Sequence, residues 1–291
     1  MLILQNVVLP GMIVPAIAAL LGLLVGRLLH RGDAAAGTGG ALPLGLSFVA
    51  AYVAIAGWPR WMPVEATQRL FFFIVLAALL SAPLRRLNSG ARLAAVFVLA
   101  TPATALLLQA QIQHRWSGAQ SAVWILALGA LSVVLAAAWT QATQVAVSSR
   151  DTGPHPSVWH DAVLHAALIG SAALALGLTG SAFLGQMMGA VAIGCLVVGI
   201  AQCLGNKVWH PADGLVWLLS AGGLVLLGFF YSELGGLPAI LLTASLVLLA
   251  GHHPGSSVPR KMLILLPALV AAALAVYGVV TAPPDPYAGY G

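Results

Sequence analysis

Long apolar blocks follow one another along the chain, and short segments rich in proline, glycine and charge separate them. Each block approaches the roughly 20 residues that a helix needs to cross the ~30 Å hydrocarbon core of a bilayer. The block ends predict ten helices, over residues 8–29, 41–58, 67–84, 91–112, 119–147, 159–178, 181–204, 212–231, 236–251 and 261–281. The connections leave no room for a soluble domain. We therefore expect a single transmembrane domain over residues 1–282 and a short, disordered extracytoplasmic tail over residues 283–291.

The distribution of apolar residues around each block decides which kind of membrane structure forms. Inside lipid every backbone N–H and C=O needs an internal partner, so only helices and closed barrels span a bilayer. The strands of a barrel would alternate apolar and polar residues, whereas these blocks are apolar on every face. The sequence therefore predicts an all-α, polytopic integral membrane bundle.

Composition supports this class. Hydrophobic residues make up 60% of the 291 positions and charged residues only 7%, against roughly a quarter charged in a soluble domain. The formal charge of +5 comes from basic residues scattered singly between apolar blocks. That pattern is typical of membrane topology signals, and we expect membrane lipids, not nucleic acid, as partners.

The basic residues predict an orientation. Nine lie in the odd-numbered connections and three in the even-numbered ones, which sums to the twelve in the chain. The two sets are Arg27, Arg31, Arg85, Arg86, Arg92, Arg150, Lys207, Arg260 and Lys261, and then Arg60, Arg69 and Arg115. Because cytoplasmic loops carry an excess of Lys and Arg, we expect a multi-pass cell-membrane protein with both termini outside the cytoplasm.

Histidine and aspartate gather at two predicted cytoplasmic helix starts. Asp161 and His165 are four residues apart and share a helix face. His160 precedes this pair, and His210 and Asp213 occupy the matching start of the helix over 212–231. The segments 158–160 and 208–210 both read Val-Trp-His, which suggests two copies of one hairpin. The five side chains are our candidate binding site, for a cation or a proton.

A competing interpretation needs no site. Histidines at helix ends can lie among lipid headgroups, and an aspartate at a helix N-terminus interacts favourably with the helix dipole. Two metal ligands on one helical face require a spacing of three or four, and His160 and His165 are five apart. We therefore predict no metal site and no cofactor.

Function is less clearly indicated than fold. No charged residue falls near the middle of any predicted helix, which counts against a proton pump or a proton-coupled carrier. We find no phosphate-binding glycine loop, Cys-x-x-Cys, His-x-x-x-His or Gly-x-Ser-x-Gly, so an enzyme is the least favoured class. Two hypotheses stay open: a permease or facilitator for a small uncharged or lipid-like substrate, and a structural or assembly subunit of a larger membrane complex.

Pairs of glycines spaced four apart predict close helix packing. Gly22 with Gly26, and Gly185 with Gly189, form small-residue faces that let two backbones approach. We expect the helix over 181–204, which carries the second pair, to be central. The same faces could also serve contacts with other membrane subunits or with a second copy of the chain.

Overall fold

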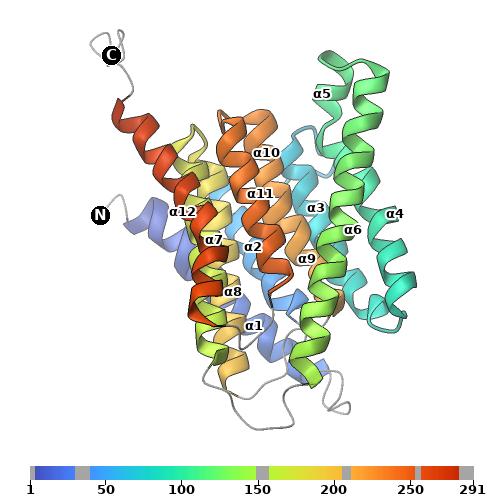
Figure 1. The fold of residues 1–291 in the computed structure, drawn as a ribbon, viewed down its shortest axis with the longest axis vertical. Helices are drawn as coiled ribbons and strands as arrows, with labels where there is room; N and C mark the ends of the chain where they lie inside the picture. Colours follow the sequence, from blue (N-terminus) through green and yellow to red (C-terminus); the bar gives the residue numbers. More distant parts are fainter. Residues whose placement is uncertain (1–3, 30–39, 149–156, 205–210, 253–256, 282–291) are drawn as a thin grey trace.

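The protein is a bundle of helices. The computed structural model describes residues 4–29, 40–148, 157–204, 211–252 and 257–281, and all regular structure in these ranges is helical (Figure 1). In chain order the elements are η1 (Leu4–Ile13), α1 (Val14–Leu29), α2 (Ala41–Ala56), α3 (Ala66–Leu84), α4 (Ser89–Leu107), α5 (Gln109–His114), α6 (Gly118–Ser148), α7 (Ser157–Leu178), α8 (Ala182–Cys203), η3 (Pro211–Asp213), α9 (Gly214–Trp217), η4 (Leu218–Gly222), α10 (Gly223–Tyr231), α11 (Gly236–Ala250) and α12 (Val258–Thr281).

The predicted fold class is confirmed. Seven helical segments of the described chain are long and apolar enough to cross a membrane. Three further apolar helices are shorter, at 10–17 residues: Ala41–Ala56, Val163–Leu178 and Gly236–Ala250. The protein is therefore an all-α membrane bundle, while the count of ten crossings stays a prediction. The tail over 283–291 lies outside the described residues.

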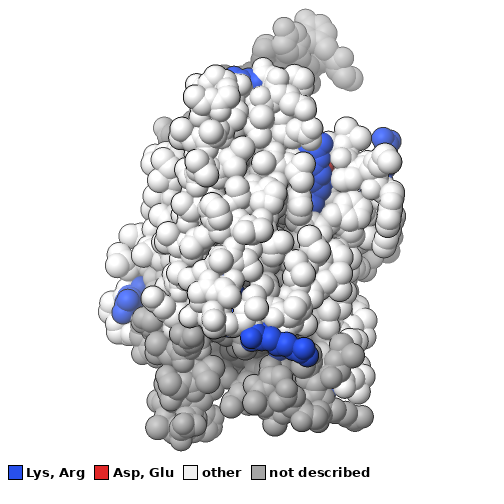
Figure 2. Space-filling view, turned by 90° about the vertical axis from the view of Figure 1, so that its right-hand side faces the viewer, with Lys and Arg blue, Asp and Glu red and all other residues white. Residues whose placement is uncertain are grey.

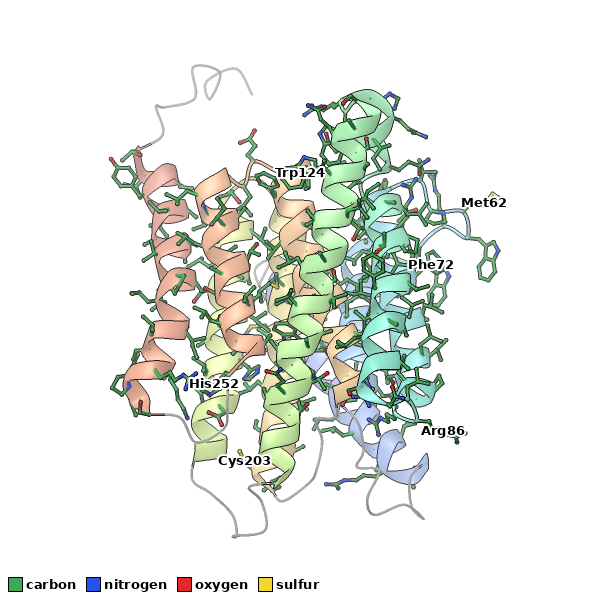
Figure 3. The ribbon with its side chains drawn as sticks, turned by 45° about the vertical axis from the view of Figure 1, so that its right-hand side comes forward. Met62, Phe72, Arg86, Trp124, Cys203 and His252 are labelled. Atoms are coloured by element: carbon green, nitrogen blue, oxygen red, sulfur yellow. The ribbon has the colours of Figure 1, made fainter. Side chains whose placement is uncertain are left out.

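Successive long helices run in opposite directions, so the bundle has two distinct ends (Figure 1). Arg86, Cys203 and His252 lie at one end, which we call the basic end, and Trp124 lies towards the opposite end (Figure 3). On the face drawn in Figure 2, the blue Lys and Arg atoms leave most of the surface white. The described helix ends that flank the odd-numbered connections thus share the basic end, although which side of the membrane it faces stays a prediction.

Two segments form the centre of the bundle. In the apolar span of α8, 61% of the residues are buried, and in the span from Gly214 to Tyr231 the share is 67%. The other five spans reach only 22–33%. The helix predicted over 181–204 is therefore central, as expected, and it packs against α7, α2 and α1.

Glycines bring neighbouring helices into backbone contact. A Cβ on Gly185 would lie 2.6 Å from the Cα of Gly177, across the α7–α8 interface. A Cβ on Gly22 would lie 2.6 Å from the Cα of Pro43, between α1 and α2. Gly22 and Gly185, one glycine of each predicted pair, thus serve packing within the chain. By contrast, no atom lies within 4 Å of a Cβ built on Gly189.

Three helices predicted as continuous change their helical geometry. The helix expected over 8–29 is a π-helix as far as Ile13 and an α-helix from Val14. Side-chain hydrogen bonds accompany the other two breaks. The helix expected over 91–112 is broken at Leu108, where the carbonyl oxygens of Leu106 and Leu107 accept hydrogen bonds from the side chains of Arg69 and Tyr231. The helix expected over 212–231 consists of a 3₁₀ turn, an α turn, a π segment and a final α-helix. We call this run from Pro211 to Tyr231 the discontinuous helix.

The π segment of the discontinuous helix contains a buried serine. The Ser220 hydroxyl donates to the carbonyl of Val216 at 2.7 Å and lies 3.1 Å from that of Trp217. A serine hydroxyl inside a helix competes with the backbone for such carbonyls, and π segments inside α-helices occur frequently at functional sites. The most buried span of the bundle therefore also contains a change of helical geometry.

Candidate functional site

The discontinuous helix begins at the basic end with a fully buried aspartate. Asp213 lies in the 3₁₀ turn, and its carboxylate accepts a hydrogen bond from the backbone N–H of Gly40 at 2.8 Å. Its other oxygen forms an ion pair with Arg85 of the α3 C-terminus, at 3.1 Å. The Asp213 side chain is 0% exposed and that of Arg85 is 12% exposed. The carboxylate makes no side-chain hydrogen bond to the start of its own helix; it connects α2, α3 and α9 instead.

A second ion-pair cluster joins three other helices at the same end. The Asp161 carboxylate, in the first turns of α7, lies 2.7 Å from Lys261 Nζ of α12 and 3.1 Å from His252 Nε2, just after α11. Burial raises the pKa of the Asp161 carboxyl, but the hydrogen bonds from His252 and Lys261 outweigh burial and hold that pKa below its ordinary value. This carboxylate therefore stays charged and connects α7, α11 and α12.

His165 lies beside Asp161 on α7 but does not reach its carboxylate. Its Nδ1 is 2.8 Å from the Asp161 backbone carbonyl, and because a carbonyl only accepts, Nδ1 carries the proton. The imidazole packs edge-on against Trp139 of α6, with ring centroids 6.4 Å apart. Trp139 in turn stacks on Trp217 of α9 at 5.2 Å. An indole therefore lies between His165 and the discontinuous helix.

The structure thus brings together some of the predicted site residues and places others apart. Asp161 and Asp213 each have basic partners from distant parts of the chain, and the ion pairs of the two clusters share no residue. The His160 side chain and His210 lie outside the described residues, so convergence of all five groups stays a prediction. Among the side chains that are described, no group of three or more His, Cys, Asp or Glu is placed to hold a metal ion.

Three residues that pair with these aspartates were not part of the predicted site: Arg85, His252 and Lys261. One feature of the sequence could have pointed to them: all three fall at odd-numbered connections, on the same predicted side of the membrane as Asp161 and Asp213. A carboxylate that enters a membrane bundle is costly unless it is paired. The bases nearest to that side were therefore the available partners, although the sequence did not indicate which base would pair with which acid.

A cleft opens at the opposite end of the bundle, with a volume of about 790 Å³. Its walls come from the start of α3, the α4–α5 break, the α7–α8 turn and the end of α10. The lining residues are Val64, Glu65, Ala66, Thr67, Arg69, Leu107, Gln109, Ala110, Gln113, Gly180, Ser181, Phe183, Leu184, Leu227, Tyr231, Ser232 and Glu233. A volume of this size lies in the range of small-molecule sites, roughly 300–1,000 Å³.

Hydrogen bonds between helices hold one wall of the cleft. Arg69 of α3 donates to the Leu106 carbonyl at 2.6 Å, and the Tyr231 hydroxyl of α10 donates to the Leu107 carbonyl at 2.8 Å. Gln111 of α5 donates back to the carbonyl of Phe230 at 2.8 Å. The α4–α5 break is therefore attached to both α3 and α10, and the cleft is formed before any ligand arrives.

The discontinuous helix connects these two ends. It starts at the ion-paired Asp213 and finishes at Tyr231, in the cleft. Two turns after its start it carries Trp217, which is 1% exposed and whose indole N–H has no hydrogen-bond partner within the described chain. A buried donor without an acceptor costs about 1–3 kcal/mol. This helix is therefore both central and locally under-satisfied.

Comparison with known proteins adds no identity: no protein-family model matches the chain, and no curated protein or solved structure shows significant similarity to it.

Proposed function

We propose that this integral membrane protein is a permease or facilitator for a small uncharged or lipid-like substrate, and that the substrate enters through the cleft. One observation supports this proposal above others. The most buried span in the bundle is discontinuous, and it runs from a buried ion pair at the basic end to an open cleft at the other end. Broken helices near the bilayer midplane are a recurrent feature of transporters.

The centre of the bundle is closed in this conformation. Phe48, Ile74 and Val191 lie about halfway along α2, α3 and α8, and each is at most 1% exposed. Ser220, halfway along the discontinuous helix, is 0% exposed. Passage of a substrate therefore requires a second conformation, in which the discontinuous helix moves and the ion pair between Arg85 and Asp213 opens.

The second hypothesis, a structural or assembly subunit, rests on the exposed apolar helices at the edge of the bundle. On α1, for example, Leu20, Leu21 and Leu24 are each more than 50% exposed. Lipid covers such a face in a monomer, and another subunit covers it in a complex. An assembly subunit, however, needs neither a cleft nor a discontinuous central helix.

Labelling of a buried cysteine tests the proposal. In a chain whose own Cys195 and Cys203 are replaced by alanine and serine, Ser220→Cys should react with a membrane-impermeant thiol reagent added from the cleft side. Ser245→Cys on α11 is the matched control, because Ser245 is also 0% exposed and also donates to a carbonyl four residues earlier. The control should stay unlabelled.

A further substitution connects the labelling to the ion pair. Arg85→Gln removes the partner of Asp213 and should raise the labelling rate of Ser220→Cys from the basic end. If Ser220→Cys stays as inert as the Ser245→Cys control in both backgrounds, the central helix does not open, and the assembly-subunit hypothesis replaces the permease.

A further inference from the structure

The chain contains only two glutamates, Glu65 and Glu233, and both line the cleft. They come from different elements: Glu65 immediately precedes α3, and Glu233 follows α10. The ion pairs within the described chain involve Asp161 and Asp213 and neither glutamate. Two exposed carboxylates therefore face the cleft without a basic side chain within 4 Å of them in the described structure.

Arg69, the one basic residue in the lining of the cleft, pairs with backbone carbonyls and not with either glutamate. Arg69 directs its guanidinium at two backbone carbonyls, those of Leu106 at 2.6 Å and Pro63 at 3.4 Å. Leu106 lies in the last turn of α4, where unpaired carbonyls give a helix a partial negative charge of roughly half an electron. The positive charge of Arg69 is therefore partly offset where it lies, and the formal charge of the cleft is negative by one.

The floor of the cleft is apolar and aromatic. Leu107, Leu184 and Leu227 line it together with Phe183 and the ring of Tyr231. Aromatic faces attract cations through their quadrupole, and apolar walls bury hydrocarbon. The cleft therefore combines a negative rim with a hydrophobic interior.

We infer that the cleft binds an organic monocation that carries apolar substituents, such as an amphiphile with an ammonium head. This inference rests on the proposed function, in that the cleft is taken as the entrance for the substrate. It narrows the substrate from small uncharged or lipid-like molecules to lipid-like molecules with a cationic group. Glu65 and Glu233 hold the cation, and the leucine and aromatic side chains hold the apolar part.

Binding of two size-matched probes of opposite charge tests the inference. The purified full chain in nanodiscs is titrated with tetraphenylphosphonium, followed with an ion-selective electrode, and in parallel with tetraphenylborate; empty nanodiscs correct for partition into lipid. We expect saturable binding of the phosphonium alone. Glu65→Gln and Glu233→Gln should each weaken it about threefold, and the double variant about tenfold. Ala119→Lys, an equal change of charge at an exposed position of α6 outside the cleft, should leave it unchanged.

Salt dependence of the unmodified protein gives a second measurement that needs no variant. Raising the ionic strength screens exposed carboxylates and should weaken phosphonium binding. Equal binding of both probes, or glutamate variants that behave like Ala119→Lys, would overturn the inference. The permease proposal fails independently: phosphonium binding with an inert Ser220→Cys would refute transport alone, whereas labelling of Ser220→Cys without phosphonium binding would refute the cation site alone.

Discussion

Substituting Gly185 by alanine should force α7 and α8 apart. The new Cβ would lie 2.6 Å from Gly177 Cα, 2.8 Å from Gly177 N and 2.9 Å from the Ala173 carbonyl oxygen, all of them backbone atoms that cannot rotate away. Contacts of 3.4 Å and above are ordinary, so the helices would have to separate by about 0.8 Å. Overpacking of this kind costs about 1–3 kcal/mol.

Gly189→Ala, four residues further along α8, is the control variant that separates the cost of overpacking from other effects of the substitution. A Cβ there meets no atom within 4 Å, and glycine to alanine inside a helix gains up to about 1 kcal/mol through propensity. Because both substitutions gain the propensity term, the free energies of unfolding of Gly185→Ala and Gly189→Ala should differ by about 1–3 kcal/mol. Unfolding in mixed micelles with increasing SDS, followed by tryptophan fluorescence, measures this difference. Equal stability of the two variants would show that the close α7–α8 approach described above does not exist.

Four further predictions concern charge, the α7–α8 turn and topology. In a double-mutant cycle, Asp213→Asn and Arg85→Gln should show a coupling energy of about 1–3 kcal/mol in unfolding, since they form one buried pair; additive effects would disprove the pair. The pKa of the Asp161 carboxyl is lower in the folded protein than in the unfolded chain, where it is near 3.9. The ionised carboxylate therefore stabilises the fold fully above that pH, and this stabilisation is lost as the pH falls through the folded-state pKa. Thermal melts from pH 6 to 3 should show a fall in melting temperature that is absent in Asp161→Asn. Gly180 has a φ of +99°, which alanine adopts only with strain, so Gly180→Ala should lower the free energy of unfolding by about 1–2 kcal/mol. Thermal melting measures this loss. Leu87→Cys, in the α3–α4 connection and in a chain without other cysteines, should resist an impermeant thiol reagent on intact cells; labelling there would reverse the predicted orientation.

The apolar blocks predicted the helices well because burial in lipid imposes one rule, that backbone groups pair within the segment. The breaks could not be predicted in the same way. The interruption at Leu108 coincides with hydrogen bonds from Arg69 and Tyr231, which lie 37 and 124 residues away from the carbonyls that they reach. Local pattern contains no information about such partners.

The candidate site shows the same division. Asp161 and Asp213 stood out in the sequence because charge is rare in this chain. In the structure each forms an ion pair, Asp213 with Arg85 and Asp161 with Lys261. Their partners follow from which helices pack together, which periodicity does not reveal in blocks that are apolar on every face. The cleft was missed for a related reason, since its lining residues come from four separated segments, and Glu65 and Glu233 each look like an ordinary helix-end residue when taken alone.

The π segment around Ser220 has a mechanical consequence for the two ends of the protein. Each residue turns an α-helix by about 100° and advances it by 1.5 Å, and a π turn holds one residue more than an α turn. If the segment relaxed to α geometry, α10 would rotate about its own axis by roughly 100° relative to Asp213, which its ion pair holds in place. The Tyr231 hydroxyl would then lose its bond to the Leu107 carbonyl, and Glu233 would swing away from the cleft. Under the permease proposal, one extra residue in the middle of the helix would therefore couple the two ends of the bundle.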